Sequence, residues 1–203
     1  MCRAFRNTNF GIRAALDFGL IVIIVATIAL NQHRLEAFSA DQPLTEYQVK
    51  AAYIYYFAKF TNWPASAFPS NGAPIVIGII GDEGFASLLT DVVKGKTIKD
   101  HPITVYRLKG AAGLGAYHIL FVGSSEHRNF RYIAESLKER PVLTITEADE
   151  SSNQKGIINL FFEGGKIQFE VDTLAAETVH LQISSKLLRL SLGSSETRQA
   201  KGR

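Results

Sequence analysis

The chain is poor in cysteine, because Cys2 is the only one in 203 residues. Cys2 lies in an N-terminal segment that we expect to be removed, so we expect neither disulfides nor thiol chemistry in the mature protein. It precedes the apolar run near the N-terminus and is therefore not placed for lipid attachment. A domain of this size can be stable on its hydrophobic core alone, without covalent crosslinks.

An excess of charge of one sign is missing as well. The formal net charge is +3, and the first 40 residues contribute +2 of it, with four arginines against Asp17 and Glu36. The rest of the chain therefore carries only +1. Nucleic-acid-binding domains normally show a basic excess, so the composition argues against a nucleic-acid partner.

Signatures of common active sites are also lacking. The sequence contains no G-x-G-x-x-G, G-x-x-x-x-G-K-[ST] or G-x-S-x-G motif, which argues against dinucleotide, P-loop and serine-hydrolase chemistry. The histidines after the first 40 residues share no metal-ligand spacing on one element. We therefore predict no catalytic residue, no metal and no cofactor.

One long apolar run is present, at residues 18–30. Arg3, Arg6 and Arg13 precede this run and polar residues follow it, an order typical of a secretory signal. The run is shorter than the ~20 residues that cross a bilayer comfortably. We predict a signal peptide over residues 1–40, with cleavage after Ser39 preferred over Ala40, and an uncleaved membrane anchor stays open as the alternative.

Aromatic residues are concentrated in one segment, since seven of the 21 lie between Tyr47 and Trp63. Thr45 and Gln48 have the spacing of a capping box, which predicts a helix that begins near Thr45. Pro64 predicts that the helix ends around Asn62 or Trp63. Five apolar side chains recur at helical spacing and are expected to share one buried face: Val49, Tyr53, Tyr56, Phe57 and Phe60.

Strand-like and helix-like runs alternate after this helix. Strands are predicted at 74–80, 102–107, 117–122 and 142–146, with helices at 85–93 and 126–139 between them. This alternation predicts a three-layer α/β sandwich with a mostly parallel sheet.

The last third of the chain breaks this pattern. Runs 157–162 and 166–171 flank Gly164 and Gly165, which predicts an antiparallel hairpin and therefore a mixed sheet, because both central residues of the tight turn need positive φ. A short helix is expected at 173–177, and 181–192 begins like a strand and continues like a helix. Residues 41–193 are predicted to form a single domain, and 194–203 a disordered tail.

Two residues are candidates for ligand binding. Asp82 follows an apolar strand and precedes a helix, where α/β sheets usually bind ligands, although a helix cap is the simpler explanation. His118 opens another apolar strand, where a hydrogen-bonded structural histidine is the more common case. We predict Asp82 and His118 as ligand-binding residues, each against that simpler explanation.

Four stretches of the sequence carry a family resemblance: 49–64 with its aromatic residues and final Trp-Pro, 79–82, 118–122, and 183–190. On these motifs the chain, over about residues 46–192, resembles the YfiR/HmsC-type periplasmic proteins (DUF4154). The first and last stretches are distinctive in residue type and spacing, whereas the middle two are weak by themselves.

The resemblance implies an exported, non-catalytic α/β domain. It implies binding to the periplasmic sensor portion of an inner-membrane diguanylate cyclase, which is held inactive, so that cyclic di-GMP and biofilm formation fall. An OmpA-like outer-membrane lipoprotein is the second implied partner, because such a protein relieves the repression by sequestering the repressor. Relatives often carry a cysteine just before the histidine, where this chain has Tyr117, so a disulfide switch is not expected.

Other functions stay open at this point. A small-molecule sensor without catalysis would bind its ligand near Asp82 or the aromatic helix. An exported enzyme would have only His118 and Asp82 to use. A homodimer is also compatible with the sequence.

Overall fold

The computed structural model describes residues 45–110, 117–137, 139–147 and 152–191, which belong to one unit of the chain. The predicted signal peptide (1–40) and tail (194–203) lie outside these residues, as does the predicted cleavage site.

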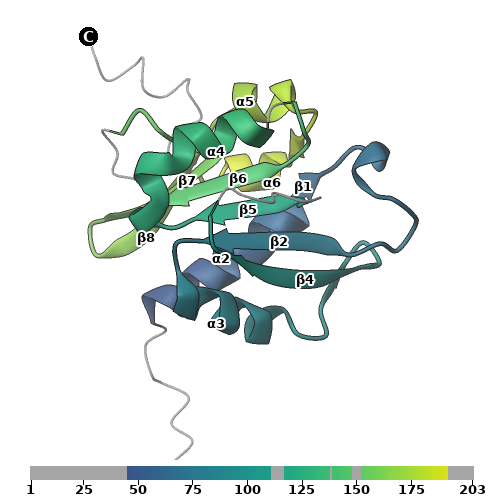
Figure 1. Ribbon diagram of the computed structural model, residues 1–203, viewed down its shortest axis with the longest axis horizontal. Coiled ribbons are helices and arrows are strands. Elements are labelled where there is room, and N and C mark those ends of the chain that lie inside the picture. Colours follow the sequence, from purple (N-terminus) through teal and green to yellow (C-terminus); the bar gives the residue numbers. More distant parts are fainter. Residues whose placement is uncertain (1–44, 111–116, 138, 148–151, 192–203) are drawn as a thin grey trace, which may run out of the picture. The chain divides into compact units, whose positions relative to one another are not determined.

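A seven-stranded mixed sheet organises the described residues (Figure 1). Its spatial order is β3-β4-β2-β5-β6-β7-β8, with parallel pairing from β4 through β7 and antiparallel pairing of β3 and β8 at the two edges. This confirms the predicted α/β class with a mostly parallel sheet and a C-terminal hairpin. The strands are β2 (Ile75–Ile80), β3 (Thr97–Ile98), β4 (His101–Leu108), β5 (Ile119–Val122), β6 (Leu143–Glu147), β7 (Ile158–Glu163) and β8 (Lys166–Val171).

The hairpin between β7 and β8 turns at the predicted place. Gly164 and Gly165 have φ values of 58° and 77°, a conformation that glycine adopts without steric cost and other residues rarely adopt. Glu163 and Lys166 are paired directly across this two-residue turn.

Helices cover both faces of the sheet. The helices are α2 (Glu46–Phe60), α3 (Glu83–Val93), α4 (Phe130–Leu137), α5 (Thr173–Thr178) and α6 (Ser185–Leu188), with the 3-10 turns η1 (Ala65–Ala67) and η2 (Ser124–Asn129). Successive side chains of a strand point to opposite faces. Ile119 and Phe121 of β5 accordingly join an apolar cluster with α2, α3 and α6, whereas Leu120 and Val122 join a second cluster with α4.

The aromatic helix α2 begins at the predicted residue, but it is rotated about its axis, so that a different face from the predicted one packs against the sheet. Thr45 Oγ1 accepts from the Gln48 amide at 3.3 Å, and Gln48 Oε1 accepts from the Thr45 amide at 2.8 Å, so the capping box is confirmed. The prediction that Tyr56 is buried was wrong, because its side chain is 49% exposed. The face toward the sheet is formed by smaller residues together with one aromatic: Ala51, Ile54, Phe57 and Ala58.

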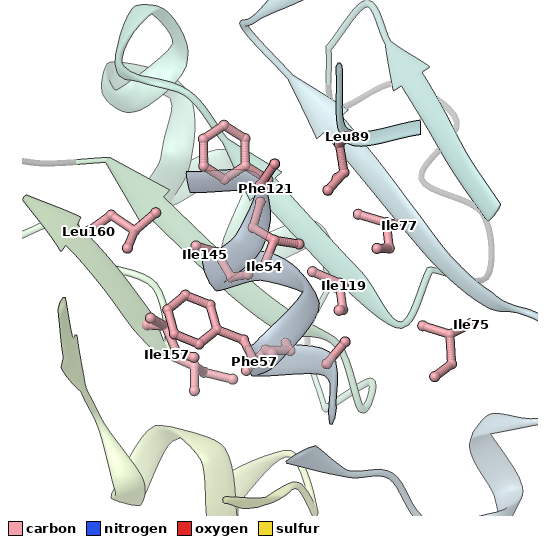
Figure 2. Packing of buried hydrophobic residues seen from close by; sticks show 14 of the residues in the cluster. Ile54, Phe57, Ile75, Ile77, Leu89, Ile119, Phe121, Ile145, Ile157 and Leu160 are labelled. Atoms are coloured by element: carbon pink, nitrogen blue, oxygen red, sulfur yellow. The ribbon is translucent and has the colours of Figure 1, made fainter. Parts of the chain in front are cut away.

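Phe57 lies at the centre of this face. Its ring centroid is 5.0 Å from that of Phe169 on β8 and 5.7 Å from that of Tyr53. Figure 2 shows Ile54 and Phe57 pointing toward Ile119, Ile145 and Ile157. Alanines at positions 51 and 58 let the helix approach the sheet closely, and Phe57 fills the remaining space.

A second, two-stranded sheet ends the helix earlier than predicted. β1 (Thr61–Asn62) pairs antiparallel with β9 (Gln182–Ile183), and the Ser184 amide donates to the Phe60 carbonyl at 2.9 Å. Because Thr61 is already extended, α2 stops at Phe60 and not at the predicted Asn62 or Trp63. This pairing ties the C-terminal segment to the aromatic helix.

Candidate functional site

The two predicted ligand residues lie at opposite ends of the parallel strands. The His118 amide donates to the Val76 carbonyl at 2.9 Å, which places His118 level with the start of β2. Asp82 comes six residues later, after β2 has ended. At ~3.3 Å per residue the two residues are about 20 Å apart, so they do not form one site.

Asp82 caps helix α3. Its Oδ1 accepts from the Phe85 amide at 3.0 Å, a typical N-cap bond. A hydrogen bond from Tyr47 to Asp82, together with the negative charge of Asp82, raises the pKa of the Tyr47 phenol. Both observations give Asp82 a structural role at the carboxyl end of the sheet.

Lys50 crosses the same end of the sheet from helix α2. Its ammonium lies 2.6 Å from the Glu147 carboxylate, at the end of β6, and also pairs with Glu46. Burial by itself would lower the pKa of Lys50, but the hydrogen bonds with Glu147 and Glu46 outweigh it and leave that pKa raised. Lys50 therefore stays charged and attaches the first turns of α2 to the sheet.

The crevice where such sheets usually bind ligands is closed in this protein. The strand order reverses between β2 and β5, and ligands of doubly wound folds bind at that switch point. Here the two loops touch, since Ser125 Oγ donates to the Gly81 carbonyl at 2.6 Å and the Gly123 amide donates to the Ile80 carbonyl at 2.9 Å. Gly81 has φ +81°, and an added Cβ would lie 2.7 Å from Ser125 Oγ.

A charged hollow of about 380 Å³ remains beside this closed crevice, on the β4 side. Asp82, Glu83 and Glu126 line it together with Arg107 and Lys109, and Arg107 pairs with Glu83. The lining of this hollow therefore carries charges of both signs.

His118 is the centre of an aromatic arrangement at the amino end of the sheet. The ring of Phe68 is stacked between the rings of His101 and His118, with centroids 4.1 and 4.5 Å away. Trp63 meets His118 edge-on at 6.1 Å, and its indole nitrogen donates to the His118 carbonyl at 3.1 Å. Three parts of the chain, at 63–68, 101 and 118, therefore meet around Phe68 and His118.

His118 is held in its neutral form. Its Nδ1 accepts from the Val76 amide at 3.1 Å, so the ring proton resides on Nε2. Burial lowers the pKa of His118, the nearby His101 lowers it further, and the backbone of Ala67 opposes the shift only in part. A neutral, buried histidine at this place is a structural residue that holds the segment after α2 against β2.

A hollow of about 330 Å³ opens next to these stacked rings. Its apolar lining comes from Trp63, Phe68 and neighbouring isoleucines, and its polar lining includes Asn62 and Lys99. The Lys99 ammonium donates to Asn62 Oδ1. A concave surface with aromatic walls and a few polar groups is the usual form of a small-molecule site.

Comparison with models of known protein families shows the family to which the chain belongs. The model of the YfiR/HmsC-like family matches residues 47–192, which is nearly all of the described structure. The chain belongs to the YfiR/HmsC-like family. A search among curated proteins finds no match to the chain.

The family motifs of this YfiR/HmsC-like protein make contacts with helix α2 and its extension at both ends of the sheet. Trp63 of the first motif contacts His118 of the third, and Thr61 of the first pairs with Ile183 of the fourth. Tyr47, which precedes the first motif, interacts with Asp82 of the second. The motifs are therefore the contacts by which α2 and its extension are held against the sheet.

Most residues around the 330 Å³ hollow were missed by sequence reasoning. His118, which stacks on Phe68 and does not line the hollow itself, was predicted, whereas the lining residues Phe68, His101 and Lys99 were not. The concentration of aromatic residues that ends at Trp63 was the one signal pointing to this place. Among the residues that the structure describes, no helix is both long and apolar enough to span a bilayer.

Proposed function

We propose that this YfiR/HmsC-like protein is a periplasmic regulator that acts by binding and not by catalysis. It binds the sensor portion of an inner-membrane diguanylate cyclase and holds the enzyme inactive, which lowers cyclic di-GMP and biofilm formation. Family membership over residues 47–192 is the observation that carries this proposal. The signal-like order of residues at the N-terminus supports the periplasmic location.

The geometry of the candidate residues supports binding over catalysis. Asp82 uses a carboxylate oxygen to cap α3, Lys50 is paired with two glutamates, and His118 is buried and neutral. A catalytic acid or base needs access to a substrate proton. These three residues instead hold α2 and α3 to the sheet, so we assign the function to the surface of the domain.

Deleting the gene and measuring cyclic di-GMP tests this proposal. We expect the level to rise in cells that express the cyclase and to fall again when the full chain is supplied in trans. The same deletion in cells without the cyclase is the control and should change nothing. Overproduction of the OmpA-like lipoprotein should have the effect of the deletion. An unchanged cyclic di-GMP level in the cyclase-expressing strain would refute the proposal.

The hollow beside Phe68 favours a second candidate function, the sensing of a small molecule. Its volume of about 330 Å³ lies at the lower end of the usual range for ligand pockets. A thermal-shift screen with amino acids and vitamins should find a compound that raises the melting temperature. The shift should disappear in Lys99→Ala, at the rim of the hollow, and persist in Lys166→Ala on the distant β8. A screen without any stabilising compound speaks against this function.

A further inference from the structure

Acidic residues are missing from several segments of the chain, residues 101–125 among them. Three others, residues 51–81, 92–99 and 179–191, contain no aspartate or glutamate either, whereas the whole sequence has 19. Asp82, Asp91, Asp100 and Glu177 stand at or near the borders of these three segments. The three are far apart in sequence, so their common composition matters only if the fold brings them together.

The fold does bring these three segments together around the C-terminal half of α2. Lys96 lies over the ring of Tyr55, 4.8 Å from its centroid, and Lys99 donates to Asn62. Ile183 pairs with Thr61 in the two-stranded sheet. These three acid-free segments therefore form one continuous region of the domain.

Six exposed cations lie on this region, and we call them the basic face: Lys59, Lys94, Lys96, Lys99, Lys186 and Arg189. None of them takes part in an ion pair among the described residues, where the salt bridges involve Lys50, Arg107 and Lys155 instead. Exposed cations such as Arg128 and Arg131 next to the opposite face of the sheet also make no ion pair among the described residues, so the basic face is distinguished by the clustering of its six cations.

Aromatic side chains accompany these cations. Tyr56 is 49% exposed and stacks on Phe60 at 6.3 Å, and it meets Tyr55 edge-on at 5.9 Å. Tyrosine is enriched at the centres of protein interfaces because it offers a large contact area with few rotatable bonds. Exposed cations around such a centre attract a partner of opposite charge and fix its orientation.

We propose that the basic face is the docking surface for an acidic segment of a protein partner. In this arrangement Tyr55, Tyr56 and Phe60 form the contact centre, and the surrounding lysines and arginine pair with carboxylates of the partner. The proposal rests on the proposed function for the partner's identity, the sensor portion of the cyclase. Charge complementarity carries it, because the six cations have no carboxylate partner among the described residues. Tyr56 stacks on Phe60 and meets Tyr55 edge-on, and such tyrosines are enriched in protein interfaces, so we assign a protein as the partner.

A matched pair of charge reversals tests the basic face in the full chain. Lys59→Glu with Lys96→Glu changes the charge of the face by −4, and Arg128→Glu with Arg131→Glu makes the same change at exposed positions next to the opposite face of the sheet. The probe is a fluorescent random copolymer of glutamate and tyrosine, and its binding is followed by anisotropy at two salt concentrations. We expect about a tenfold loss of affinity in the first variant only, and weaker binding at high salt.

The possible results test the basic face as a docking surface independently of the proposed regulation of the cyclase. Equal losses in both variants, or no loss in either, would overturn the docking surface. Binding to phosphatidylglycerol vesicles in place of the copolymer, lost in the first variant, would overturn it in favour of a membrane. If the Lys59→Glu/Lys96→Glu variant has a lowered melting temperature, the Lys59→Gln/Lys96→Gln variant replaces it. This second variant removes the two positive charges without reversing them, so we expect about half the loss in the logarithm of the affinity.

Complementation of the deletion strain supplies the functional half of the test. The natural protein and the Arg128/Arg131 variant should restore low cyclic di-GMP, and the Lys59/Lys96 variant should not. If the natural protein itself has no effect on cyclic di-GMP, the proposed function fails while the copolymer result still decides the surface. If both variants restore low cyclic di-GMP, the basic face is not the docking surface.

Discussion

Replacing neighbouring aromatic residues of α2 tests the rotation of this helix against the sheet. Phe57 is completely buried and contacts the rings of Phe169 and Tyr53, whereas Tyr56, the preceding residue, is 49% exposed. The sequence pattern predicts equal burial of both. Phe57→Ala and Tyr56→Ala should therefore differ strongly in the free energy of unfolding, although each removes one ring from the same turn.

The expected magnitudes follow from burial. Removing a fully buried phenylalanine costs about 3–5 kcal/mol, because apolar contacts are lost and a cavity is left. For a domain of this size each kcal/mol lowers the melting temperature by about 2–4 °C, so Phe57→Ala should melt about 6–20 °C earlier. Tyr56→Ala loses mainly its stacking on Phe60, worth about 0.5–1.5 kcal/mol.

Urea denaturation followed by circular dichroism measures both free energies, and thermal melting provides the check. Equal slopes against urea concentration would show that the variants unfold from comparable folded states. If Tyr56→Ala costs as much as Phe57→Ala, or if Phe57→Ala costs less than about 1 kcal/mol, the described rotation of α2 is refuted.

Three further predictions concern the two ends of the sheet. Because the pKa of His118 is lowered in the folded state, the unfolded chain binds a proton at a higher pH than the folded protein does. The free energy of unfolding should therefore fall as the pH drops below about 6.5. Urea denaturation at pH 7.5 and 5.5 measures this fall, which should be smaller in His118→Gln. Asp82→Ala should lower stability by about 0.5–2 kcal/mol through loss of the α3 cap and bring the pKa of Tyr47 back toward its ordinary value, measured by thermal melting and ultraviolet titration. Gly81→Ala should destabilise by about 1–3 kcal/mol, whereas Gly84→Ala, whose added methyl group meets nothing within 4 Å, should stabilise by up to about 1 kcal/mol; melting curves compare the two.

Local sequence signals predicted the elements whose causes are local. The capping box at Thr45, the glycine pair at 164–165 and the apolar runs of the strands act over a few residues, and each is found close to its predicted place. The order of strand-like and helix-like runs was enough for the sheet type, because parallel strands require crossovers between them. The predicted end of α2 was wrong because Ile183, a residue distant in the sequence, pairs with Thr61.

The rotation of α2 and the composition of the candidate site depend on distant contacts. A helical stripe that contains Tyr53, Tyr56 and Phe57 is wider than the face that one sheet can cover, and periodicity does not say which edge of it stays exposed. Ala51 and Ala58 lie on the face of α2 that packs against the sheet, because small residues allow the closest approach of the helix. The Trp63 and His118 contact spans 55 positions, and no pattern in a single sequence specifies such a pair.

The residues that attract attention in the sequence are unsuited to testing the function. Asp82, His118 and Phe57 hold the fold together, so any change in them alters stability and binding at once. Lys59 and Lys96 make no ion pair among the described residues, and the Lys96 ammonium lies over the Tyr55 ring. Surface substitutions of this kind usually change stability by less than about 0.5 kcal/mol. A loss of repression at unchanged melting temperature in the Lys59/Lys96 variant would therefore report binding alone, which no substitution in the core can do.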